Sequence, residues 1–268
     1  MSTPIRIAAA AAAIGVLAVV GGIVPRTTGP GGPDALASPS PSPTAPPTAL
    51  HQGSLVAGDY TVTPFVRNEW APCAPAEFTC PEAERDDTIR LTFTVPDGWA
   101  GAPLGSDIWL AVEHNSGPGG AGFLLGRGGW LYSEPCSDTE DPDIPVGPTV
   151  DDFVGALVNH PLLEVTEPVE TTLSGYPGQY LEIQVPADIA SCPYYQAWAP
   201  TFYAQGPSNL WPIWILDVNG VRVVVHGSQF PGTAPERAAE LRAIVGSIRI
   251  DYVTPEPTDP SPASSSVP

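Results

Sequence analysis

Apolar and polar residues alternate with a period of two in several segments, the pattern of strands that bury one face. Residues 88–95 place four apolar side chains on one side, and residues 179–185 repeat the alternation. Residues 213–226 contain two nearly continuous apolar runs separated by Asn219-Gly220, a dipeptide typical of a type I′ hairpin turn. Because such runs suit strands covered on both faces, we expect this hairpin at the centre of a sheet.

Two other segments follow the helical period. Residues 149–160 begin with Thr149 as N-cap, and residues 233–248 begin with Thr233 as N-cap and Glu236 three positions later, a capping box. Strands and helices in this order predict an α+β fold, a mostly antiparallel sheet with two main helices packed on it. The apolar stripes of the two helices comprise Phe153, Val154, Leu157 and Val158, and Ala238, Leu241, Val245 and Ile248.

The ends of the chain differ from its middle. An uncharged apolar run within residues 1–24 is about 27 Å long as a helix, so it can just span a bilayer. We predict an uncleaved membrane anchor there, with a cleaved signal segment as the alternative. Residues 25–53, rich in Pro, Ser and Ala, predict a stalk, residues 54–253 a globular domain, and residues 254–268 a disordered Pro/Ser-rich tail.

If the chain is exported, its four cysteines are expected to form disulfides, because thiols outside the cytoplasm are oxidised in pairs. Cys73 and Cys80 are close enough in sequence to close a short loop, which leaves Cys136 to pair with Cys192. We prefer this pairing among the three that four cysteines allow. The spacing lacks a C-x-x-C pair, so a disulfide framework is favoured over a zinc site.

The charge of the chain limits its partners. The formal net charge is −19, with 29 acidic residues, and the sequence contains no lysine. Nucleic-acid binding needs clustered Lys or Arg, so we expect no nucleic-acid partner.

The densest group of carboxylates lies in residues 131–143, around Cys136. An EF-type calcium loop starting at Asp138 would need Gly at position 143 and Glu at position 149, but Asp143 and Thr149 occupy them. We therefore interpret the stretch as a solvated acidic loop held by a disulfide, and predict no metal.

Residues 192–214 contain the densest group of aromatic side chains. Exposed rings would stack on a ligand, whereas buried rings would fill space around the disulfide. If the segment binds a ligand, the residues we expect to do so are Tyr194, Tyr195, Trp198, Tyr203 and Trp211.

Catalytic patterns are weak. Glu182 and Asp217 could form a carboxylate pair for glycoside hydrolysis, but Asp217 is more simply explained by the adjacent turn. Residues 115–129 are rich in glycine and lack the Gly-Lys-Ser/Thr of a phosphate loop, so we interpret them as a loop and predict no cofactor. We predict no catalytic residues.

Seven motifs occur in order between Gly58 and Tyr252: GDYTVTPF, LTFTVPDGW, GGWLYSEPC, VDDFVGAL, SGYPGQYLEIQVP, WILDVNGVRVVV and AELRAIVGSIRI. Their order resembles that in an uncharacterised family of exported actinobacterial proteins. The PDGW segment and the SIR segment near the end of the match also resemble segments of the PsbP-like α/β sandwich of LpqN-type lipoproteins. The resemblance implies a non-catalytic role in binding a partner or ligand. Together with the predicted anchor, it leads us to expect a membrane-anchored, extracellular domain that binds or senses an unknown envelope ligand. An exported hydrolase acting on envelope material is the alternative.

Overall fold

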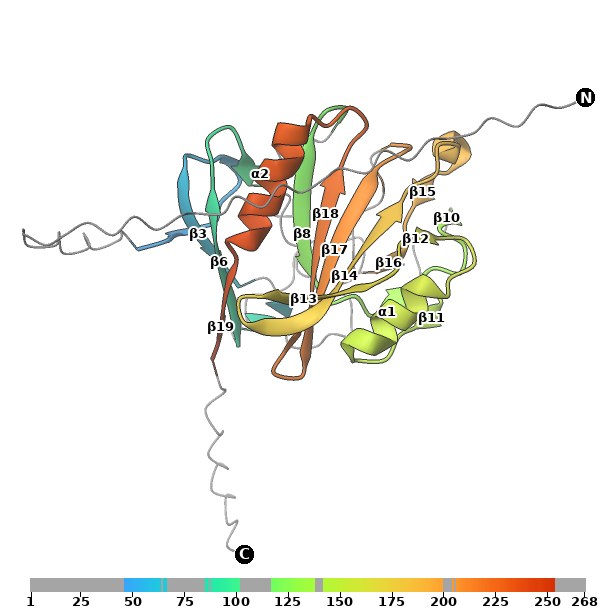
Figure 1. The fold of residues 1–268 in the computed structure, drawn as a ribbon, viewed down its shortest axis with the longest axis horizontal. Coiled ribbons are helices and arrows are strands. Elements are labelled where there is room, and N and C mark those ends of the chain that lie inside the picture. The colour runs from blue at the N-terminus through green and yellow to red at the C-terminus, as the bar shows by residue number, and fades with distance from the viewer. Residues whose placement is uncertain are drawn as a thin grey trace, which may run out of the picture. The chain divides into compact units, whose positions relative to one another are not determined.

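Strands provide most of the regular structure of the protein (Figure 1). Two α-helices and one short 3-10 helix accompany them in the part of the chain that is described. The computed structural model describes residues 46–63, 65–66, 85–86, 88–101, 117–137, 142–199, 204 and 206–253.

The main sheet has six strands, and all of its pairs are antiparallel. Its order is β12-β14-β17-β18-β8, and β13 also pairs with β14. The predicted Asn-Gly hairpin is confirmed as the central β17–β18 pair, and Asn219 and Gly220 both have the positive φ that a type I′ turn requires. The strands are β8 (Ala121–Gly126), β12 (Glu164–Val165), β13 (Val169–Leu173), β14 (Tyr176–Gln184), β17 (Leu210–Val218) and β18 (Val221–Gln229).

A second sheet has four strands in the order β1-β3-β6-β19, with β1 parallel to β3 and the other pairs antiparallel. These strands are β1 (Thr48–Ala49), β3 (Gly58–Val62), β6 (Ile89–Val95) and β19 (Arg249–Tyr252). Small sheets complete the described part: β2 (Gly53–Ser54) with β7 (Ala100–Gly101), β4 (Phe65–Val66) with β5 (Arg85–Asp86), β10 (Cys136–Ser137) with β15 (Tyr194–Tyr195), and β9 (Trp130–Leu131) between β11 (Ile144–Pro145) and β16 (Trp198–Ala199).

The two helices begin differently. Helix α1 (Val150–Val158) has the predicted N-cap, because Thr149 and Asp152 form a reciprocal capping box. Helix α2 (Pro235–Gly246) begins after Ala234, which has no side-chain cap, so the predicted cap at Thr233 is wrong. The hydroxyl of Thr233 instead donates to backbone carbonyls at 2.6 and 2.7 Å in the turn that precedes the helix.

The main sheet separates two hydrophobic cores, one on each face. Helix α2 packs on β8, β18 and β6 and covers the first core, and helix α1 packs on β14 and β17 over the second. Alternation along β18 divides its side chains between them: Val223 and Val225 face the first core and Val224 faces the second. The predicted stripe of α1 extends one residue too far, because Val158 is exposed.

A buried arginine ties helix α1 to the main sheet. The guanidinium of Arg222, on β18, donates to the backbone carbonyls of Arg127, Gly128, Gly147 and Thr149. It also lies over the Phe153 ring, 4.9 Å from the ring centroid. One side chain therefore joins the segment after β8 and the N-terminus of α1 to a central strand.

The predicted fold class, an α+β sandwich of PsbP-like type, is wrong. The described part of the chain is mostly β, its strands divide among several sheets, and a helix-packed sandwich is not seen. In addition, residues 121–126 form β8, although the surrounding glycine-rich stretch predicted a loop.

Other predictions fall at the ends of the described residues or beyond them. Strand β1 and the start of β2 lie in the range assigned to the stalk. The predicted anchor (1–24), the tail from residue 254, and the Cys73–Cys80 pair lie outside the described residues. None of the described helices has the length and apolar character needed to cross a bilayer.

Candidate functional site

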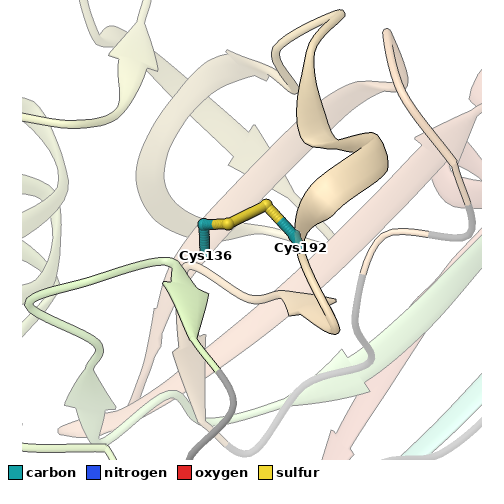
Figure 2. Close-up of a disulfide and its surroundings, with 2 residues drawn as sticks. All are labelled: Cys136 and Cys192. Atoms are coloured by element: carbon teal, nitrogen blue, oxygen red, sulfur yellow. A yellow bond between two sulfur atoms is a disulfide. The ribbon is translucent and has the colours of Figure 1, made fainter.

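The disulfide between Cys136 and Cys192 is present, which confirms this part of the predicted pairing (Figure 2). Cys136 begins β10, and Cys192 follows the 3-10 helix η2 (Ile189–Ser191). Their Cα atoms are 5.1 Å apart. Because β10 pairs with β15, Cys136 also lies opposite Tyr195, so the disulfide fastens the start of the aromatic segment to β10, within the acidic stretch.

Most of the aromatic residues predicted to bind a ligand are core residues. Tyr195, Trp198 and Trp211 are between 1% and 4% exposed, and their rings contact one another in the second core. Tyr194 is 36% exposed, and Tyr203 lies outside the described residues. Burial therefore leaves Tyr194 as the described member of the predicted set with substantial exposure.

Two buried histidines serve the packing of this region. His226 lies between Trp198 and Trp211, with ring centroids 4.8 and 5.0 Å away, and burial lowers its pKa to about 3. The imidazole is therefore neutral at physiological pH. In His160, Nδ1 accepts from the backbone N–H of Leu162 and Nε2 lies 2.8 Å from the Tyr132 carbonyl oxygen, so Nε2 is the nitrogen that donates.

The described end of the acidic stretch is also used structurally. Asp143 accepts hydrogen bonds from the hydroxyl and the backbone N–H of Ser133 at 2.6 and 2.7 Å, and these bonds lower the pKa of its carboxyl group. Asp138, Glu140 and Asp141 lie outside the described residues. Within the described ranges, no three His, Cys, Asp or Glu side chains gather as metal ligands would.

A different surface is built by the outer strands of the main sheet. One row of paired residues crosses five strands, from Leu125 on β8 through Val225, Trp214 and Tyr180 to Val169 on β13. Leu125 and Val225 are at most 1% exposed, Trp214 and Tyr180 are partly exposed, and Val169 is 59% exposed. The face is covered on the side of α2 and opens towards β13.

Strand alternation adds Glu182 to this face, because it lies two residues from Tyr180 on β14. We call Val169, Tyr180, Glu182 and Trp214 the open face. The rings of Tyr180 and Trp214 are 5.0 Å apart between centroids and tilted by 50°. The Tyr180 hydroxyl donates a short hydrogen bond to Glu182 Oε1. The open face thus joins two aromatic rings to a carboxylate held in position.

Tyr180 and its surroundings determine the charge on the open face. Burial, followed by the hydrogen bond to Glu182, raises the pKa of the phenol well above its ordinary value, so Tyr180 keeps its proton at physiological pH. Arg242 on α2 is close enough to oppose this increase. The face therefore has a negative group on the sheet and a positive group nearby on the helix.

The sequence pattern points to Glu182 and to the aromatic segment that contains Trp214 as separate features, and to neither Tyr180 nor Val169 as a site residue. The signal was present in residues 179–185, where a strand that buries Leu181 and Ile183 must turn Tyr180 and Glu182 to the other side. Glu182 and Asp217 do not form the hypothetical carboxylate pair. In the register of β14 with β17, even-numbered residues of both strands share one face of the sheet, so Glu182 and Asp217 lie on opposite faces. Asp217 instead accepts a 2.6 Å hydrogen bond from the Gly220 N–H in the hairpin turn.

Comparison with protein-family models and with curated proteins found no match.

Proposed function

We propose that this protein is an exported, membrane-anchored domain that binds an envelope ligand at the cell surface through the open face, without catalysis. The observation that carries this proposal is the gradient of exposure along the Leu125 to Val169 row. It leaves the Tyr180 and Trp214 rings partly exposed beside a fixed carboxylate. Aromatic rings with a few positioned polar groups are typical of ligand sites.

Two other observations support the location. The apolar run from Ile7 to Val24 has the length of a membrane span. The Cys136–Cys192 disulfide favours an oxidising compartment, because cytoplasmic thiols are normally kept reduced. Both fit a chain whose folded part lies outside the membrane.

Co-sedimentation with isolated cell envelopes tests the binding. The full chain in mild detergent should pellet with the envelopes, and Trp214→Ala should reduce the bound fraction. Leu162→Ala is the control, because Leu162 is an exposed apolar residue between α1 and β12, outside the open face. An equal loss in both variants, or full binding by Trp214→Ala, contradicts the assignment of binding to the open face.

The location has a separate test. Protease added to intact cells that express the chain should degrade it, while a cytoplasmic marker survives. A chain that stays intact until the cells are lysed contradicts export.

A further inference from the structure

We propose that the ligand of the open face is an uncharged glycan with vicinal hydroxyl groups, stacked on Trp214 and Tyr180 and hydrogen-bonded to Glu182. This inference rests on the proposed binding function and names the class of its ligand.

The aromatic part of the face suits a sugar ring. The faces of pyranose rings carry C–H groups, which pack against aromatic rings, while their hydroxyls project from the rim. Trp214 packs on the first core along one side and keeps a partly exposed surface. Tyr180 is braced by the Trp214 ring and by its bond to Glu182. Both rings are thus held before a ligand arrives, which reduces the entropic cost of binding.

Glu182 supplies a positioned acceptor. Its backbone N–H donates to the Thr166 hydroxyl at 2.8 Å, and its carbonyl accepts from the Thr166 N–H at 2.9 Å. The Tyr180 hydroxyl fixes the carboxylate through Oε1. A carboxylate has about four lone-pair sites, so one bond from Tyr180 leaves acceptor capacity for two adjacent ligand hydroxyls.

Charge favours an uncharged ligand. An anionic ligand would meet Glu182 and a chain of net charge −19. A cationic ligand would be attracted by Glu182 and by the net charge of the chain, but at the open face it would meet the positive charge of Arg242, which reaches Tyr180. A neutral glycan can donate hydrogen bonds to the carboxylate and carries no charge that Glu182 or Arg242 would repel.

The envelope assay separates the possible ligands. Periodate cleaves the carbon–carbon bond of vicinal diols, so envelopes oxidised with periodate should lose binding of the full chain. Envelopes digested with protease should keep it. Trp214→Ala should raise the apparent Kd at least about tenfold, the change that 1.4 kcal/mol of lost binding energy produces. Glu182→Gln should raise the apparent Kd by a smaller factor, and Leu162→Ala, at an exposed apolar residue outside the open face, should leave it unchanged.

Each contrary result has one meaning. Binding that survives periodate but is lost after protease digestion, or is displaced by a lysine-rich peptide, overturns the glycan assignment and leaves the binding function standing. A chain that never pellets with untreated envelopes overturns both. Trp214→Phe, which keeps a ring, should retain more binding than Trp214→Ala, and circular dichroism shows whether each variant is folded.

Discussion

Replacing Arg222 with methionine removes the guanidinium that holds α1 and the segment after β8 to the main sheet, while keeping an apolar side chain of similar length. The four backbone carbonyls that accept from Arg222 then lose a charged donor. Methionine still packs against Phe153, so the variant tests the hydrogen bonds rather than the loss of volume.

The cost depends on which carbonyls water can reach. Gly147 and Thr149 are exposed residues, so their carbonyls regain hydrogen bonds from solvent at little cost. Gly128 is buried and Arg127 partly buried, and leaving a buried acceptor unsatisfied costs about 1–3 kcal/mol. Two such acceptors give a loss of about 4 kcal/mol, a large share of the 5–15 kcal/mol typical of folded domains.

Urea denaturation of the full chain with its disulfide intact measures this loss. At a slope of about 2 kcal/mol per molar, the midpoint of Arg222→Met should fall by about 2 M. Arg90→Met, at an exposed position on β6, is the control and should stay within about 0.5 kcal/mol of the wild type. If Arg222→Met costs less than about 1 kcal/mol, the four carbonyl bonds do not hold this region together.

Two further predictions concern covalent and pH-dependent stability. Replacing both Cys136 and Cys192 with serine should reduce the free energy of unfolding by about 4 kcal/mol, the loop-closure value for their separation of 56 residues, and an unchanged urea midpoint would contradict this. The pKa of Asp59 is lowered by hydrogen bonds from Thr94 and then Arg249, so its stabilising effect is full above the ordinary value of 3.8 and is lost as the pH falls through the lower folded-state value. The urea midpoints of wild type and Asp59→Asn should therefore differ at neutral pH and converge in acid, and a constant difference would refute the assignment.

The parts of the fold that the sequence predicted are those fixed by local chemistry. The Asn219-Gly220 turn and the Thr149 cap each depend on residues within a few positions of one another, so a short window is enough to find them. Thr233 shows the limit of that reasoning. Its spacing to Glu236 fits a capping box, but its hydroxyl bonds to the Gly120 carbonyl, more than a hundred residues away.

The fold class was wrong for the same reason on a larger scale. Strands such as β9, β10, β15 and β16 are two residues long and pair across long stretches of chain, so they leave no periodic pattern. Residues 121–126 form a strand because β18 supplies its partner, despite the glycines at both ends.

The candidate site was predictable only in part. Alternation in β14 shows that Tyr180 and Glu182 share a face, but it does not show whether another element covers that face. The local sequence does not distinguish Trp211 from Trp214. Because side chains alternate between the two faces along β17, Trp211 lies in the second core and Trp214 lies on the other face, partly exposed. Burial of this kind depends on tertiary packing rather than on residue type.

The position of the disulfide has a consequence for how the folded domain responds to proteolysis. Cys136 and Cys192 enclose helix α1 and strands β12, β13 and β14, which carry Tyr180 and Glu182. A single cut in any loop between the two cysteines would convert the chain into two covalently linked fragments and release neither. β14 would stay hydrogen-bonded to β17, so a nicked molecule could keep its open face until the bond is reduced.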